Sequence, residues 1–175
     1  TDPAVNNMSR LVDHIRKPDS EDRETRLDLA ELCQQLVDHH GRQQPAPGYQ
    51  GPASGVEVQA DPQQLHNILS HLLQNAQDAT PRDGEVSLTL KASAEYGVLF
   101  IQDTGQGMSE DFIRDSLFKP FESTKGLTGM GIGAYQAQEY VKQIGGSMDV
   151  TSEPGVGSCF TIRLPLLGRE TQTAG

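Results

Sequence analysis

The chain has 175 residues, which is enough for one domain with a hydrophobic core and a short appendage. Its 24 acidic and 14 basic side chains give a formal net charge of −10. This excess of negative charge argues against sequence-independent binding of nucleic acid and against docking on an anionic membrane, since both need clustered Lys and Arg. The cysteines, Cys33 and Cys159, lack metal-ligand spacing and are expected to be free thiols.

The N-terminal segment predicts the end of a helix followed by a linker. Apolar side chains recur at helical spacing within residues 1–17, and Lys17-Pro18 ends that pattern. Because the chain opens abruptly in this helical pattern, we expect a fragment of a longer protein. Residues 1–20 would then be the end of an upstream helix with its linker.

Four elements are expected between this linker and residue 60. Residues 41–55 are rich in Gly, Pro and Gln and predict a loop or at best an irregular edge strand. The other three are a short strand at 26–29, a helix at 30–39 and a brief strand at 56–58.

Residues 61–79 carry the clearest helix pattern. Asp61 is a suitable N-cap, Pro62 suits the first helical position, and Gln64 could complete a capping box. One face is apolar, and its members are Leu65, Ile68, Leu69, Leu72, Leu73, Ala76 and Ala79. Another face is polar, and its members are Asn67, His71, Asn75 and Asp78.

The second half of the chain alternates strands with helices. Strands are expected at 85–92, 98–102, 147–151 and 158–164, and helices within 109–128 and at 131–144. The pattern predicts an α+β fold with a mixed, mostly antiparallel sheet and helices on one face.

The stretch Asp103–Met108 is the most informative motif. It follows an apolar strand, so its carboxylate could accept a hydrogen bond from an exocyclic amine, while Gly105 and Gly107 could let a flat ring approach the backbone. Alone, the pattern also fits an ordinary turn.

Two further elements flank the Asp103–Met108 stretch in the sequence. Asn75 could bind Mg²⁺ or could merely bridge a neighbouring loop, and the glycines of 129–133 could offer N–H groups to phosphate or form a hinge.

Five ordered blocks over residues 26–166 resemble the ATP-binding domain of histidine kinases, within the wider family that includes gyrase, Hsp90 and MutL. The blocks are 65–80, 103–108, 118–121, 128–133 and 145–165. The resemblance implies a two-layer α/β sandwich of the Bergerat type. The stretch from Ser123 to Tyr140 also resembles a narrower group, the kinases associated with PEP-CTERM and exosortase systems.

The resemblance implies ATP and Mg²⁺ as cofactors and assigns roles to individual residues. Asn75 would bind magnesium, Asp103 would accept from the adenine amino group, and Gly105, Gly107 and Met108 would border the base. His71 and Asn75 would be the catalytic residues, although His71 departs from the Asn or Glu usual at its position. The remaining expected nucleotide contacts are Asp78, Lys125, Thr128, Gly129, Met130, Gly131, Ile132 and Gly133. Residues 109–130 would form a lid over the nucleotide.

The implied function is transfer of the γ-phosphoryl group of Mg·ATP to a histidine upstream of this fragment. Partners would be the protein's own dimerisation and phosphoacceptor domain in a homodimer, and a response regulator, but no nucleic acid. Residues 21–167 would be a cytoplasmic catalytic domain of a membrane-associated parent, and residues 168–175 a disordered tail. Two alternatives remain open, which are a related ATPase that does not transfer phosphate to protein and a nucleotide-binding interaction module without kinase activity.

Overall fold

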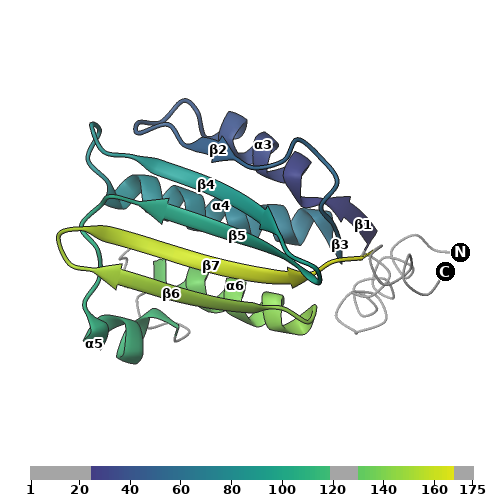
Figure 1. Ribbon diagram of the computed structural model, residues 1–175. Coiled ribbons are helices and arrows are strands. Elements are labelled where there is room, and N and C mark those ends of the chain that lie inside the picture. Colours follow the sequence, from purple (N-terminus) through teal and green to yellow (C-terminus); the bar gives the residue numbers. More distant parts are fainter. Residues whose placement is uncertain (1–24, 119–129, 168–175) are drawn as a thin grey trace, which may run out of the picture.

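A five-stranded sheet forms the centre of the computed structural model, which describes residues 25–118 and 130–167 (Figure 1). The strand order is β2-β4-β5-β7-β6, with β2 (Gly48–Gln50), β4 (Val86–Ala92), β5 (Tyr96–Asp103), β6 (Ser147–Glu153) and β7 (Gly157–Pro165). Neighbouring strands are antiparallel except β2, which pairs in parallel with β4 at the edge. A separate antiparallel pair joins β1 (Thr25–Asp28) to β3 (Glu57–Ala60).

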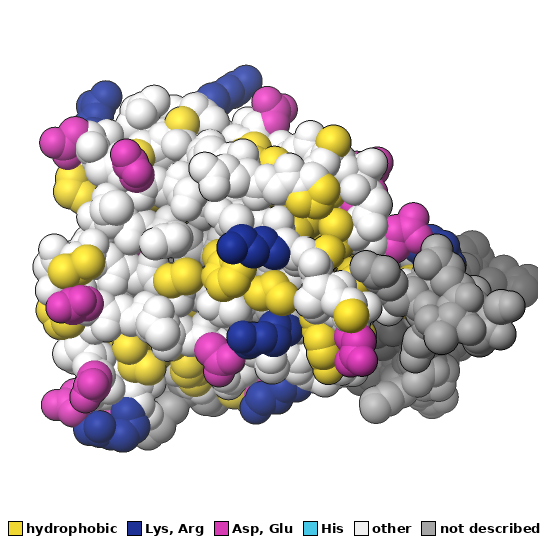
Figure 2. Space-filling view, viewed as in Figure 1, with side chains coloured by type: hydrophobic (Ala, Val, Ile, Leu, Met, Phe, Trp, Pro, Cys, Tyr) yellow, Lys and Arg dark blue, Asp and Glu magenta, His cyan; other side chains and the backbone are white. Residues whose placement is uncertain are grey.

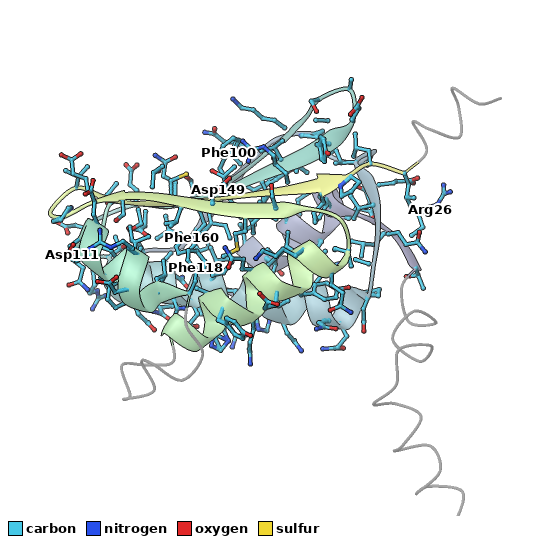
Figure 3. The ribbon with its side chains drawn as sticks, turned by 90° about the horizontal axis from the view of Figure 1, so that it is seen from below. Arg26, Phe100, Asp111, Phe118, Asp149 and Phe160 are labelled. Carbon is cyan, nitrogen blue, oxygen red and sulfur yellow. The ribbon has the colours of Figure 1, made fainter. Side chains whose placement is uncertain are left out.

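The helices cover one face of this sheet, so the molecule has two layers (Figures 1 and 3). They are α3 (Leu29–His39), α4 (Pro62–Ala79) and α6 (Met130–Gln143), with a short α5 (Glu110–Phe112) that continues into the π-helical turn η1 (Ile113–Leu117). The largest fully buried side chains lie between the layers and are almost all leucine. The expected α+β sandwich with helices on one face is confirmed.

Alternation along the central strands separates a buried from an exposed face of the sheet. Leu99 and Ile101 of β5 are buried under the helices, whereas Phe100 between them lies on the opposite side with Asp149 (Figure 3). On that outer face Lys91 Nζ lies 5.8 Å from the centre of the Phe100 ring, and Arg163 pairs with Asp149 at 3.2 Å. Figure 2 shows this face as a mixture of apolar and charged side chains.

Helix α4 begins where the sequence predicts, but its cap differs in one contact. The Asp61 carboxylate accepts hydrogen bonds from the main-chain N–H groups of Gln63 and Gln64, as an N-cap should. The main-chain N–H of Asp61 donates to the Tyr140 hydroxyl at 2.7 Å, in place of the reciprocal contact expected from the Gln64 side chain. Because α6 packs across the start of α4, a tertiary contact replaces the local capping box.

A buried glutamine fastens the loop after α3 to α4. Gln77 Nε2 donates to three main-chain carbonyls, those of His40, Gln43 and Pro45, at 3.0–3.2 Å. Its Oε1 must therefore accept from Nδ1–H of His40, at 3.2 Å. Nε2 of the neutral imidazole then accepts from the Ser70 hydroxyl at 2.7 Å. The His40 side chain is therefore buried, and both of its ring nitrogens have a hydrogen-bond partner.

We expect this arrangement to make folding stability fall in mild acid. Burial lowers the pKa of His40 below its ordinary value. The hydrogen bond with Gln77 acts to raise this pKa, whereas the nearby His39 and His66 lower it further. When the pKa of a histidine is lower in the folded state, its contribution to the free energy of unfolding is fully present above the unfolded-state pKa of about 6.5. This contribution is lost as the pH falls from the unfolded-state pKa to the folded-state pKa. Urea unfolding of wild type and His40→Gln at pH 7.5 and 5.5 measures it. The wild type should lose more stability than the variant, and equal losses would rule out His40 as the cause.

Several expectations concern residues outside the described ranges, including the helix at 1–17 and the tail at 168–175. Within residues 25–118 and 130–167, no helix combines the length and the apolar character needed to cross a membrane. Cys33 and Cys159 are free thiols, as expected.

Candidate nucleotide-binding site

A cavity of about 470 Å³ opens between α4, the end of β5, α5 and the start of α6. Its wall is largely apolar, with a few polar groups contributed by α4 and by the ends of β5 and β7. The lining residues are Leu72, Asn75, Ala76, Asp78, Ala79, Asp103, Gln106, Gly107, Met108, Ser109, Phe112, Ala134, Ser158 and Phe160. Such a cavity has the size and character of a site for a small organic ligand.

Asp103 provides the acidic group of this cavity. It ends β5, directly opposite Ser158 of β7, and only 8% of its surface is exposed. Its Oδ1 accepts hydrogen bonds from the N–H groups of Gly105 at 2.8 Å and Ser158 at 3.3 Å. Burial raises the pKa of Asp103 above its ordinary value, and these two N–H groups oppose the rise. Because the two bonds hold one oxygen in place, the other oxygen is oriented to accept from a ligand.

The loop after Asp103 is held at both sides by main-chain hydrogen bonds. The N–H of Gln106 donates to the Ala79 carbonyl at the end of α4, and the Gln106 carbonyl accepts from Gly155 in the β6–β7 turn. Thr104 adds a two-way contact with Glu85, donating its N–H to the Glu85 carbonyl and accepting the Glu85 N–H on its hydroxyl. The loop is therefore pre-organised by the protein itself.

The two glycines of this loop are required by protein contacts. A Cβ on Gly105 would collide with the Ala79 carbonyl, and one on Gly107 would collide with the Glu153 carbonyl. Gly107 also has φ +73°, which L side chains rarely adopt. The sequence suggested that these glycines admit a flat ring. In the structure they let the loop pack between α4 and the β6–β7 turn, and Gly107 also lines the cavity.

Gly107→Ala should therefore destabilise the fold more than a matched glycine substitution. Gly155 in the neighbouring turn has a similar φ of +82°, but no atom lies within 4 Å of the position that a Cβ would take there. Gly155→Ala should cost about 1–2 kcal/mol from backbone strain alone. Gly107→Ala should cost about 1–3 kcal/mol more, because the methyl group must displace the Glu153 carbonyl. Urea unfolding of both variants checks the difference, and equal losses would contradict the steric explanation.

Asn75 brings a carboxamide to the cavity from the middle of α4. Its Nδ2 is buried and has no hydrogen-bond partner among the described residues. A buried N–H donor without a partner is costly in a finished fold, so Nδ2 is expected to donate to a ligand acceptor such as a phosphate oxygen, whereas a cation would be bound by the amide oxygen Oδ1. Carboxamide and carboxylate oxygens suit a hard cation such as Mg²⁺, and Asp78 lines the same cavity one turn further along. The residues present fit a magnesium-bound phosphate ligand.

The structure brings some of the expected site residues together and separates others. Asn75, Asp78, Asp103, Gly107 and Met108 all line the cavity. His71 is exposed and does not line the cavity. Gly105 does not line it either and packs against the main chain of Ala79 at the end of α4. Met130, Gly131, Ile132 and Gly133 form the first turn of α6, next to Ala134 of the lining. Lys125, Thr128 and Gly129 lie outside the described residues.

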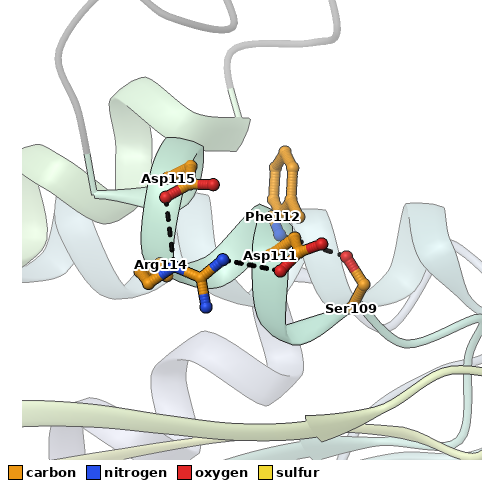
Figure 4. A network of polar contacts seen from close by, with 5 residues as sticks. All are labelled: Ser109, Asp111, Phe112, Arg114 and Asp115. Carbon is orange, nitrogen blue, oxygen red and sulfur yellow. Dashed lines mark hydrogen bonds and ion pairs between the residues drawn. The ribbon is translucent and has the colours of Figure 1, made fainter.

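The rim beside α5 was not predicted in detail. Ser109 caps this short helix by accepting from the N–H of Phe112 at 3.1 Å, and both residues line the cavity (Figure 4). Arg114 donates to Asp111 at 2.6 Å and to Asp115 at 3.2 Å on the solvent side (Figure 4). A cap signal at Ser109 is visible in the sequence, but the inward position of Phe112 depends on tertiary packing. Phe160 of β7, which also lines the cavity, was likewise missing from the expected contacts.

The comparison with protein families agrees with this site. Residues 60–168 match the family described as histidine kinase-, DNA gyrase B-, and HSP90-like ATPase. The chain belongs to this family, and the matched residues include α4, the Asp103 loop, α6 and the last two strands.

Similar curated proteins include sensor histidine kinases and a sporulation kinase. Sensor histidine kinase ZraS of Klebsiella oxytoca is 34% identical over 67% of this chain and 25% of its own length, and ZraS of Escherichia coli K12 is 36% identical over 63% and 23%. Sporulation kinase C of Bacillus subtilis is 31% identical over 64% of this chain and 26% of its own length. The chain thus spans about a quarter of the length of these relatives.

Solved structures confirm the fold. The nucleotide-free catalytic domain of histidine kinase ThkA superposes with a TM-score of 0.70 at 20% identity, covering 82% of this chain and 95% of that domain. Full-length ShkA in complex with AMPPNP gives 0.68 at 24% identity, covering 82% and 31%. The expected ATP-binding domain of the histidine kinase type is confirmed, whereas the narrower PEP-CTERM and exosortase group stays a prediction.

Proposed function

We propose that this domain binds Mg·ATP and that the whole protein uses it to phosphorylate a histidine upstream of residue 1. The observation that carries the proposal is the pairing of two incomplete polar groups in one largely apolar cavity. Only one carboxylate oxygen of Asp103 accepts hydrogen bonds from the protein, so the other is available to a ligand donor. Nδ2 of Asn75 has no hydrogen-bond partner among the described residues. The acceptor oxygen of Asp103 matches the amino group of adenine, and the carboxamide of Asn75, with an N–H donor and an oxygen, suits a metal-bound phosphate chain.

The chain's own residues would act by positioning and by electrostatics. Asp103 would orient the base, because its acceptor oxygen faces the exocyclic amine. Asn75, with Asp78 near it, would hold Mg²⁺, which neutralises phosphate charge when bound. Main-chain N–H groups in the first turn of α6, Met130–Gly133, would face the phosphates, with Lys125, Thr128 and Gly129 as further contacts. His71 would stand beside this site as a base or as a hydrogen-bonding residue.

The remaining proposals concern the parent protein. The catalytic domain would comprise residues 21–167, preceded by the end of a dimerisation helix and its linker at 1–20 and followed by a tail at 168–175. In a homodimer, the phosphoryl group would pass from ATP to the histidine of the dimerisation domain and then to a response regulator. The domain would be cytoplasmic in a membrane-associated sensor kinase.

A hydrolysing ATPase that dimerises on nucleotide is the second candidate, and residue 71 weighs against it. Hydrolysing relatives are expected to carry Glu at this position, where it activates water, and this chain has an exposed His.

Labelling separates the kinase from the alternatives. The 175-residue chain should bind ATP yet gain no acid-labile, base-stable phosphate from labelled ATP. In its sequence the acidic Asp13 precedes His14, whereas the acceptor histidine of the kinases that the chain resembles is followed by an acidic residue. A protein extended by the upstream helical hairpin should become labelled on a histidine of that hairpin. Hydrolysis without labelling of the extended protein would support the ATPase, and labelling of the short chain at His14 would contradict the proposed position of the acceptor.

A further inference from the structure

A chain of hydrogen bonds links the Asp103 loop to the last two strands beside the cavity. Ser152 of β6 lies directly opposite Ser158 of β7, and Ser158 lies directly opposite Asp103 of β5. Ser152 Oγ accepts from the N–H of Met108 at 2.7 Å, donates to the Gly157 carbonyl at 3.0 Å and lies 2.7 Å from Ser158 Oγ. Ser152 is not among the residues expected from the sequence to contact ligand.

The direction of the serine–serine hydrogen bond follows from the number of hydrogens available. A hydroxyl has one hydrogen to donate and two lone pairs to accept. The Ser152 hydrogen is used by the Gly157 carbonyl, which can only accept, so Ser158 must be the donor between the two hydroxyls. Ser152 then accepts from both Met108 and Ser158, and its capacity is fully used.

This direction leaves Ser158 as an acceptor toward the cavity. Ser158 is 8% exposed and lines the cavity, and its only hydroxyl hydrogen points away toward Ser152. Beside it, Asp103 has an oxygen that makes no hydrogen bond within the described residues. The polar end of the cavity therefore presents two acceptors next to each other and no hydroxyl donor from Ser158.

Two acceptors side by side suit an amine with two hydrogens. Directly opposite residues of an antiparallel pair have Cβ atoms about 4.5–5.5 Å apart, so the side chains of Asp103 and Ser158 are neighbours at this end of the cavity. The two N–H bonds of an exocyclic amine diverge by about 120°, so acceptors about 2.9 Å from the nitrogen lie about 5 Å from each other. A primary amine on a flat ring can thus donate to both groups, whereas a ring carbonyl would meet two acceptors.

We propose that Ser152 is a positioning residue that turns Ser158 into a second acceptor beside Asp103, so that the cavity selects a base with a free amino group. This inference rests on the proposed binding of ATP and assigns base selectivity to a residue that does not line the cavity. Ser152 acts on base selectivity only through the direction of the Ser158 hydroxyl, whereas its contact with Met108 affects the binding of both nucleotides alike. Removing the Ser152 hydroxyl frees the Ser158 hydrogen to turn toward the ligand and donate.

The test compares ATP with inosine triphosphate, in which a carbonyl replaces the amine. Calorimetry with Mg²⁺ is done on wild type, Ser152→Ala, Ser152→Thr, Ser158→Ala and the double alanine variant. In Ser152→Ala, ATP should bind less tightly and inosine triphosphate more tightly, which narrows the ratio of their affinities by about three- to tenfold, the effect of one exchanged hydrogen bond. Ser152→Thr keeps a hydroxyl and should restore the wild-type ratio. In the Ser158→Ala background, Ser152→Ala should leave the ratio unchanged.

A merely structural role of Ser152 predicts a different result. In that case Ser152→Ala would weaken both nucleotides by the same factor, or would change their ratio even without the Ser158 hydroxyl, and either result overturns the inference. Thermal unfolding of each variant shows whether the fold is kept, and Ser158→Ala carries the test if Ser152→Ala does not fold, since its ratio must also narrow. If wild type binds ATP but the ratio is insensitive to both serines, only this inference fails. If wild type binds no ATP, the proposed function fails with it.

Discussion

Asp103→Asn should weaken ATP binding by about 1–3 kcal/mol while leaving the ligand-free domain at least as stable as wild type. The Asn Oδ1 can still accept from the N–H groups of Gly105 and Ser158, so the loop should keep its shape. The outer group becomes an NH₂ donor that faces the amino group of adenine, and this leaves two donors without an acceptor. Calorimetry at neutral pH measures the loss in affinity.

Asp103→Asn should weaken ATP binding without lowering the stability of the ligand-free domain, so a loss of affinity cannot be explained by unfolding. Burial raises the pKa of Asp103, so the folded state binds its proton more tightly than the unfolded state does. Stability is therefore lost as the pH rises from the unfolded value of about 3.9 through the folded value, and an ionised Asp103 lowers stability at pH 7. Asp103→Asn removes that charge. An unchanged ATP affinity, or wild-type GTP binding as tight as ATP binding, would exclude Asp103 as the base-selecting group.

Asn75→Ala should abolish the gain in ATP affinity that Mg²⁺ provides. The carboxamide lines the cavity, and its buried Nδ2 lacks a partner within the described residues, so the fold itself loses no hydrogen bond that the structure shows. Affinity for ATP is measured by calorimetry with millimolar Mg²⁺ and with a chelator. The wild type should bind more tightly with the metal, and the variant should bind equally in both conditions.

Asn67→Ala is the matched control for this experiment. Asn67 lies on the same helix, is exposed and accepts a hydrogen bond from Gln63 at 3.3 Å, away from the cavity. The control should show the full wild-type response to Mg²⁺. If magnesium strengthens ATP binding in Asn75→Ala by the wild-type factor, then Asn75 does not act through the metal.

The sequence predicted the parts of the fold that depend on short stretches of chain. Helix α4 was expected from its apolar stripe and its cap at Asp61, and both are present. The acidic residue at the end of a strand was expected from the run 98–103, because alternation and a following glycine are local signals. These features need no knowledge of distant contacts, which is why they can be recognised before the fold is known.

Features that depend on distant partners could not be predicted in this way. Gln77 lies within the α4 pattern, yet its three carbonyl partners belong to a loop more than 30 residues earlier. Ser152 has the pattern of an ordinary strand residue, and only the register shows that it lies opposite Ser158, which itself lies opposite Asp103. The parallel pairing of β2 with β4 is equally invisible, since a three-residue strand in a Gly- and Pro-rich segment carries little periodicity.

For the glycines of the Asp103 loop, the sequence indicated close approach of the main chain but not the group that it approaches. Their presence indicated close backbone approach, and that approach exists. The group they approach is the main chain of α4 and of the β6–β7 turn, and sequence spacing gives no information about which surface comes near. The consequence is a rigid loop that holds the Asp103 carboxylate in position before any ligand arrives.

The most direct test of the account is to titrate ATP and Mg²⁺ into the ¹⁵N-labelled 175-residue chain and follow the amide signals by NMR. If the cavity binds ATP, we expect saturable shifts for the main-chain amides of Gly105, Gly107 and Ser158 and for the side-chain amide of Asn75, with little change on the outer sheet face around Phe100. The ¹⁵N signals should respond far less to GTP at the same concentration. No saturable shifts, or shifts centred away from the cavity, would contradict the assignment of this cavity as an adenine nucleotide site.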